Sequence, residues 1–266
     1  MTDVFVGIDL GTTTTLIARA TEVEGQVSVK VLGIDERDKD GERINYLPSL
    51  AYFEPGKPPL VGMAAQRAGM QDTRYLVRAV KRQMGRRLVV PQAGILPYNV
   101  AALYLQKALD EAKYQMVGDY VFTVTVPASF TSNQRADTLK ALKLACERSG
   151  VEFPKEDAGQ VFISEPVAAV LAFINNVLRR PADVRDIDLK KVNFILVYDI
   201  GGGTCDLTLV AVEPKNPSIA QVTGLADLKI TVKAISYYNP FGGEDFDELV
   251  AKELHRRLLK AFPELE

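Results

Sequence analysis

Several residue types on which common kinds of site depend are scarce in this sequence. Its 266 residues include one histidine, His255, two cysteines, Cys146 and Cys205, and no tryptophan. A single histidine leaves little room for histidine-based catalysis or for a His-rich metal site. Two cysteines in unrelated contexts indicate neither a disulfide framework nor a metal-binding motif. This cysteine usage is typical of a protein in a reducing cytoplasm, where we expect it to be located.

An excess of one charge and long apolar segments are also absent. Lys and Arg total 32 against 34 Asp and Glu, a net charge of −2, which argues against nucleic acid as a partner. No apolar run approaches the roughly 20 residues that span a membrane, so we expect no membrane partner. The N-terminus carries Asp3 and no basic segment, so it lacks the pattern of a signal peptide.

What remains is the composition of an ordinary soluble globular protein, 47% hydrophobic and 25% charged. The length predicts one large or two medium domains. Alternating apolar residues predict strands, and apolar residues that recur every 3.6 positions predict helices. The predicted strands are 4–10, 15–20, 27–33, 120–127, 161–166, two hairpin strands within 194–212, and 228–236. The predicted helices are 63–84, 98–116, 131–149, 166–178 and 247–261. This alternation favours a layered α/β fold.

Local signals refine some of these segments. Thr131 and Gln134 have the spacing of a helix capping box, and Gly150 supplies a stop signal at the end of the same helix. The basic cluster that begins at Lys81-Arg82 is interpreted as a solvated helix end. The last helix carries an apolar stripe from Phe246 to Ala261, which we expect to need a packing partner.

Two segments repeat one chemical pattern. "VGIDLGTTTTLIA" and "VYDIGGGTCDLTLV" each run from an apolar strand through Asp to a glycine turn with Thr, and then into a second strand. Glycine lets the backbone approach a ligand closely, and the exposed N–H groups of such a turn bind anions. The equivalent carboxylates, Asp9 and Asp199, would reach a phosphate only through magnesium and its waters. Two such hairpins facing each other would grip a polyphosphate.

Each feature of this pattern also has an ordinary structural reading. A single Asp-x-Gly-Thr turn is common, and it is the second copy that favours phosphate binding. Asp206 follows Asp199 by seven residues on the returning strand and could face the same site. Alternatively, Asp206 is a solvent-facing residue of an edge strand.

Five motifs occur here in the order found in DnaK-type 70 kDa heat-shock chaperones: "GIDLGTT", "VTVPASFTSNQR", "ISEPVAA", "YDIGGGTCDLTL" and "FGGEDFD". The chain therefore resembles the N-terminal part of their ATPase domain, a member of the actin, sugar-kinase and chaperone superfamily. The resemblance implies an actin-like ATPase (ribonuclease H-like) fold with two lobes, each a mixed sheet flanked by helices, and ATP between them. We expect residues 1–178 to form lobe I, with an inserted subdomain near 35–100, and residues 179–266 to form a partial lobe II.

The resemblance also implies which residues contact the nucleotide. ATP or ADP phosphates would be held by one loop of each lobe and by a third loop nearby; these residues are Gly11, Thr12, Thr13 and Thr14, then Gly201, Gly202, Gly203 and Thr204, and finally Gly243 and Glu244. Asp9 and Asp199 would orient Mg²⁺ through water. Glu165 and Asp206, together with Asp199, would position the attacking water or the metal shell. Glu165 is also a carboxylate that a helix N-terminus favours.

Three positions depart from the family pattern. Gln66, in "VGMAAQRAG", stands where the family has a catalytic lysine, Thr14 replaces a tyrosine, and "YYNPF" replaces a polar loop before "GGEDFD". A neutral amide cannot offset charge on the transferred phosphoryl group. We therefore expect nucleotide binding with slow or absent hydrolysis.

The resulting function prediction is an ATP-binding domain of a DnaK-like chaperone that couples Mg-ATP state to the binding of protein clients. Clients and co-chaperones would act through C-terminal regions outside these 266 residues, which we expect to be an N-terminal fragment or a short relative. Two alternatives are a pseudo-ATPase regulatory scaffold, which Gln66 favours, and an actin-like filament ATPase. The Glu-Pro motif at Glu165 and the "FGGEDFD" segment favour the chaperone.

Overall fold

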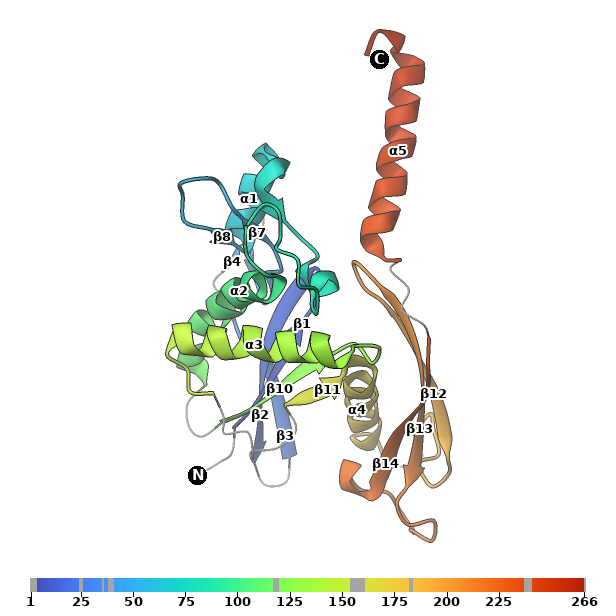
Figure 1. Cartoon of the computed structure of the whole chain (residues 1–266). Coiled ribbons are helices and arrows are strands. Elements are labelled where there is room, and N and C mark those ends of the chain that lie inside the picture. The colour runs from blue at the N-terminus through green and yellow to red at the C-terminus, as the bar shows by residue number, and fades with distance from the viewer. Residues whose placement is uncertain are drawn as a thin grey trace. The chain divides into compact units, whose positions relative to one another are not determined.

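Figure 1 shows the computed structural model of the chain, which describes residues 4–23, 26–34, 36–37, 41–116, 120–153, 161–181, 184–236 and 241–265. The chain divides into two compact units, Met1–Ala168 and Ala169–Glu266. Helix α4 (Glu165–Leu178) crosses this division, and the predicted boundary after residue 178 falls at its C-terminal end. Among the described residues, no helix is long and apolar enough to cross a bilayer.

The first unit is built on a mixed sheet with the order β11-β10-β1-β2-β3, and a short strand, β6, also pairs with β2. Its strands are β1 (Val4–Leu10), β2 (Thr14–Val23), β3 (Gln26–Val31), β6 (Leu47–Pro48), β10 (Tyr120–Val126) and β11 (Phe162–Ser164). Strand β10 is parallel to both β1 and β11, whereas β2 is antiparallel to β1 and to β3. The mixed sheet with its helices confirms the predicted α/β fold.

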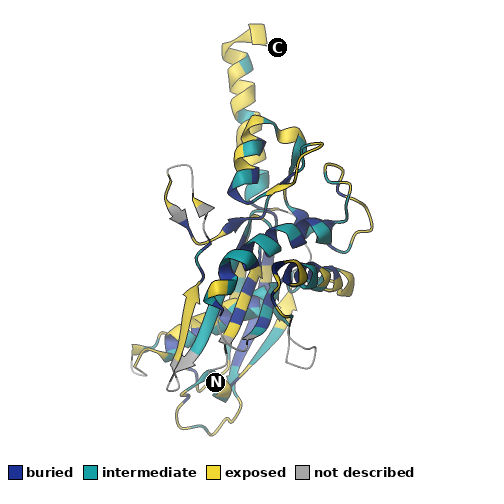
Figure 2. Ribbon diagram, turned by 90° about the vertical axis from the view of Figure 1, so that its left-hand side faces the viewer, coloured by how far each residue is buried: buried dark blue, intermediate teal, exposed yellow. Residues whose placement is uncertain are grey.

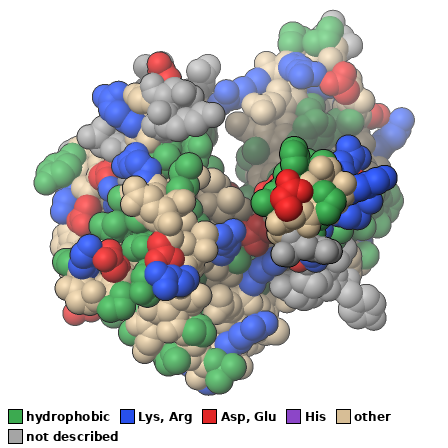
Figure 3. All heavy atoms as spheres, turned by 90° about the horizontal axis from the view of Figure 1, so that it is seen from above, with side chains coloured by type: hydrophobic (Ala, Val, Ile, Leu, Met, Phe, Trp, Pro, Cys, Tyr) green, Lys and Arg blue, Asp and Glu red, His purple; other side chains and the backbone are tan. Residues whose placement is uncertain are grey.

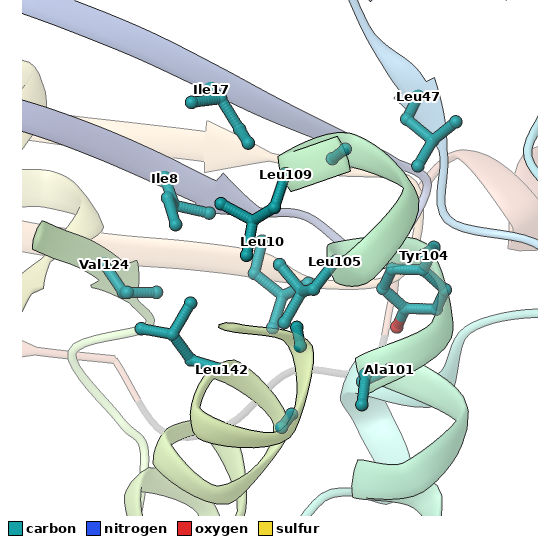
Figure 4. Packing of buried hydrophobic residues seen from close by; sticks show 14 of the residues in the cluster. Ile8, Leu10, Ile17, Leu47, Ala101, Tyr104, Leu105, Leu109, Val124 and Leu142 are labelled. Atoms are coloured by element: carbon teal, nitrogen blue, oxygen red, sulfur yellow. The ribbon is translucent and has the colours of Figure 1, made fainter. Parts of the chain in front are cut away.

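Helices α2 (Pro97–Ala112) and α3 (Ser132–Ser149) pack together over one face of this sheet. Alternate residues of β1 point into that core, and Ile8 and Leu10 are almost fully buried while Asp9 between them is exposed. Figure 4 shows Leu105 and Leu109 of α2 beside the strand residues, with Leu142 of α3 close by. The predicted capping box at Thr131 and Gln134 is formed, and Gly150 adopts a left-handed conformation at the helix end, as expected.

The described residues between the third strand and α2 form short elements. Besides β6 these are β4 (Glu36–Arg37), β5 (Arg43–Ile44), β7 (Ala51–Tyr52), β8 (Leu60–Val61), α1 (Met63–Gln71), η1 (Thr73–Tyr75), β9 (Leu76–Val77) and η2 (Val80–Gln83). The predicted helix 63–84 is therefore wrong beyond Gln71. Asp72 adopts an extended conformation and accepts a hydrogen bond from the Arg74 N–H, and the chain then pairs with β7 through Leu76. Sheet pairing overrides the helical period here.

The second unit contains an antiparallel sheet of β12 (Asn193–Ile200), β13 (Cys205–Pro214) and β14 (Leu228–Ile235). Val170, Ile174 and Val177 of α4 are buried in one cluster with Val210 and Val212 of the sheet. The other face of β12 carries exposed apolar side chains, such as Phe194 and Leu196, each 63% exposed. The predicted hairpin and third strand are confirmed.

The last helix, α5 (Gly243–Ala261), begins at Gly243 rather than at the predicted Asp247. The Gly242 N–H donates to the Asp245 carboxylate at 2.7 Å, which fixes the earlier start. No described residue of α5 is buried, and Figure 2 shows the helix as largely exposed. Its apolar stripe therefore has no cover within the described residues. Acidic and basic side chains are interspersed over the face drawn in Figure 3, in line with the net charge of −2.

Candidate functional site

The first glycine turn joins β1 to β2 and is held from two sides. The Gly11 N–H donates to the Thr14 carbonyl at 3.0 Å and closes the turn. The Ser49 hydroxyl donates to the Gly11 carbonyl at 3.0 Å, and the Ser49 N–H donates to the Thr13 carbonyl at 2.8 Å. A hydrogen bond of 2.9 Å joins the Ser49 and Thr15 hydroxyls, which are both buried. Thr13 is exposed at the tip, and Gly11, Thr12 and Thr14 are half-buried.

The second glycine turn joins β12 to β13 and repeats the same closure. The Gly201 N–H donates to the Thr204 carbonyl at 2.9 Å, as Gly11 does to Thr14. The first turn of α5 packs against this loop: the Gly243 N–H donates to the Gly201 carbonyl at 3.0 Å, and the Glu244 N–H donates to the Gly202 carbonyl at 2.8 Å. Gly243 and Glu244 therefore lie against the loop, and their N–H groups donate hydrogen bonds to its carbonyl oxygens. Gly203 and Thr204 complete the turn.

The backbone at Gly242 lies very close to the second glycine turn, which allows the start of α5 to pack against this turn. A Cβ atom at Gly242 would lie 2.6 Å from the Gly201 carbonyl oxygen and 2.7 Å from the Gly203 nitrogen, closer than real Cβ atoms come. Only glycine fits at this position without displacing the loop.

The predicted metal-linked aspartates lie at the ends of the strands that lead into the two turns. In the first unit, Asp9 lies opposite Thr125 in the parallel ladder and accepts a hydrogen bond of 2.8 Å from its hydroxyl. In the second unit, Asp199 lies directly opposite Asp206 in the antiparallel ladder. Directly opposed residues have Cβ atoms about 5 Å apart on one face of the sheet, so the two carboxylates repel each other.

Asp206 is the more informative member of this pair. It is 9% exposed, and its Oδ1 atom is buried and has no hydrogen-bond partner among the described residues. The solvent-facing alternative for Asp206 is therefore wrong.

No group of three or more His, Cys, Asp or Glu side chains in the described residues could enclose a metal ion. Magnesium is commonly held by one or two carboxylates together with waters and phosphate oxygens, so the Asp199–Asp206 pair fits it.

Glu165 begins α4 immediately after β11, so it is a helix N-terminal carboxylate as the sequence suggested. It is also ion-paired: the Lys81 Nζ atom lies 2.5 Å from the Glu165 Oε1 atom. Lys81 belongs to η2 and is only 8% exposed, so its interpretation as part of a solvated helix end is wrong. The pair joins residues 84 positions apart, and no periodicity along the chain signals it.

Gln66 lies in α1 and is exposed, and it is held by backbone hydrogen bonds of the helix. Sequence reasoning missed four supporting residues, namely Thr15, Ser49, Lys81 and Thr125. The run of threonines after Gly11 could have indicated Thr15, since it adjoins the turn. Ser49 and Thr125 reach the site only through sheet pairing, so no local signal marks them.

A family model with the description "Hsp70 protein" matches residues 5–102 and 89–261, which together span nearly the whole chain. The mixed sheet flanked by helices agrees with the actin-like ATPase fold of the N-terminal lobe in that family. On this evidence the chain belongs to the Hsp70 family.

Proposed function

We propose that this chain binds Mg-ATP and Mg-ADP through the Gly11–Thr14 and Gly201–Thr204 loops. The observation that carries the proposal is the duplicated turn, closed by the same backbone hydrogen bond in each unit and preceded by an aspartate. Hsp70 proteins are ATPases that bind ATP and Mg²⁺ and work with client proteins and co-chaperones, which supports the same role here. Coupling of nucleotide state to a client, and a cytoplasmic location, are part of this proposal.

In this proposal, hydrogen-bond donors of the two turns bind the phosphates directly, and carboxylates of the chain bind them through Mg²⁺. Backbone N–H groups and threonine hydroxyls of the turns donate to phosphate oxygens. Bound Mg²⁺ would neutralise phosphate charge and also the mutual repulsion of Asp199 and Asp206. The Oδ1 atom of Asp206, which has no hydrogen-bond partner among the described residues, would then gain one in the metal shell.

Titration calorimetry with Mg-ATP tests the proposal. We expect the native chain to bind, and Asp199→Ala to weaken binding by at least about tenfold because it removes one of the two carboxylates. Asp186→Ala is the matched control, since this aspartate of the same unit is 71% exposed and lies outside the loops. Native binding that Asp199→Ala leaves unchanged would refute the role of the second loop.

We further propose that hydrolysis is slow because Gln66 is neutral. A lysine at this position would add a cation for the transferred phosphoryl group, where such groups contribute several kcal/mol. Gln66→Lys should raise the single-turnover rate by about tenfold or more, whereas Gln66→Met, a neutral residue of similar length, should not. A native rate equal to that of the Gln66→Lys variant would contradict this part of the proposal. Binding without turnover in both proteins would favour a pseudo-ATPase scaffold.

A further inference from the structure

Lys81 is a buried cation beside a residue of the proposed site. Its side chain is 9% exposed and that of Glu165 is 18% exposed, and their charged atoms lie 2.5 Å apart. Val80 of η2 and Met84, which follows η2, are almost fully buried, and the Lys81 Nζ atom lies 6.0 Å from the centre of the Phe130 ring. An ammonium group is placed in such surroundings only when it is paired, since burying an isolated charge is costly.

The sheet places this pair at the edge where the first glycine turn lies. Ser164 of β11 lies opposite Val126 of β10, and Asp9 of β1 lies opposite Thr125, all in parallel register. The carboxyl ends of the strands β11, β10 and β1 therefore lie side by side along one edge of the sheet. Two strand spacings separate Glu165 from Gly11, a distance of about 10 Å. In α/β sheets, ligands bind outside the carboxyl ends of parallel strands, which is this edge.

We infer that Lys81 is a positioning residue of the nucleotide site. It holds the Glu165 carboxylate in one orientation at the sheet edge and places a buried positive charge there, in a chain whose Gln66 is neutral. This inference rests on the proposed function. The ion pair also connects η2 to α4. A purely structural role for Lys81 is therefore the alternative, and an experiment must distinguish it from a positioning role.

Variants of both partners provide the first test. We expect Lys81→Met to lower the single-turnover rate by about tenfold while the dissociation constant of Mg-ATP changes less than about threefold. Lys81→Arg keeps the charge and should restore most of the rate. Adding Lys81→Met to Glu165→Gln should lower the rate little further, because the two residues act as a unit. Lys107→Met, which breaks a helix surface pair with Glu111, is the control.

A spectroscopic measurement on the native chain keeps the inference testable if hydrolysis is too slow to measure or Lys81→Met does not fold. Protein labelled with ¹⁵N at the lysine side chains should give a protected ammonium signal for Lys81, assigned by its loss in Lys81→Arg. Saturating Mg-ATP should shift this signal, because the pair adjoins the proposed phosphate site. The Lys107 signal should stay in place.

Each outcome decides between the explanations. A Lys81 signal that does not move when Mg-ATP binds means a structural tie, and it overturns the inference. So does a Lys81→Met variant that binds and turns over ATP like the native chain. Absence of Mg-ATP binding to the native chain in calorimetry overturns the proposed function, and this inference with it.

Discussion

Gly11→Ala is the most direct test of the first loop, because the structure leaves no space for a Cβ atom at this residue. A Cβ atom at Gly11 would lie 2.3 Å from the Thr14 carbonyl oxygen, which is backbone and cannot rotate away. The loop must move by about 1 Å, since C···O contacts shorter than about 3 Å are repulsive. That movement disrupts the closing hydrogen bond to Thr14 and the bond from Ser49, each 3.0 Å long.

The magnitude follows from these contacts. Overpacking of a tight site costs about 1–3 kcal/mol, and each weakened hydrogen bond costs about 1 kcal/mol. Gly11→Ala should therefore lower the free energy of unfolding of the first unit by about 3–5 kcal/mol and its Tm by roughly 10 °C. Mg-ATP binding should also weaken strongly, because the turn no longer presents its N–H groups.

Gly201 supplies the matched control in the second loop. A Cβ atom there would lie 3.7 Å from the Thr204 carbonyl oxygen, an ordinary contact. Gly201→Ala should change the free energy of unfolding by less than about 1 kcal/mol. Urea unfolding followed by circular dichroism and Mg-ATP calorimetry on both variants would check this. Equal stability and equal affinity of the two alanine variants would refute the reasoning.

Three further predictions concern buried polar groups. Asp206→Asn removes the cross-strand repulsion with Asp199, so without Mg²⁺ the protein should be more stable by about 1 kcal/mol in urea unfolding, while Mg-ATP affinity in calorimetry falls. The Asp137 carboxylate is buried and accepts a 2.9 Å hydrogen bond from the Gly85 N–H. Asp137→Ala should therefore cost about 2–3 kcal/mol in thermal unfolding, and Asp137→Asn, which keeps an acceptor, clearly less. Burial raises the pKa of the Cys146 thiol from 9.0 to about 12. Above pH 9 the unfolded chain loses this proton first, so the free energy of unfolding should fall by about 1 kcal/mol per pH unit, and Cys146→Val should reduce that slope.

The sequence by itself determined the elements whose signals are local. The capping box at Thr131 and Gln134 and the stop at Gly150 were predicted at the residues where they occur. The two glycine turns were also recognisable, because their chemistry lies within a few consecutive residues. The five motifs together led to the family to which the chain belongs.

Only the tertiary structure decided how these elements support one another. It ended the helix at Gln71, buried Lys81 against Glu165, and placed Ser49 under the first turn. It also set Asp199 directly opposite Asp206. A repeating pattern reports which face of one element is apolar, but it carries no information on which partner that face or a buried charge will meet. That choice depends on sheet order and register, which bring together residues far apart in the chain.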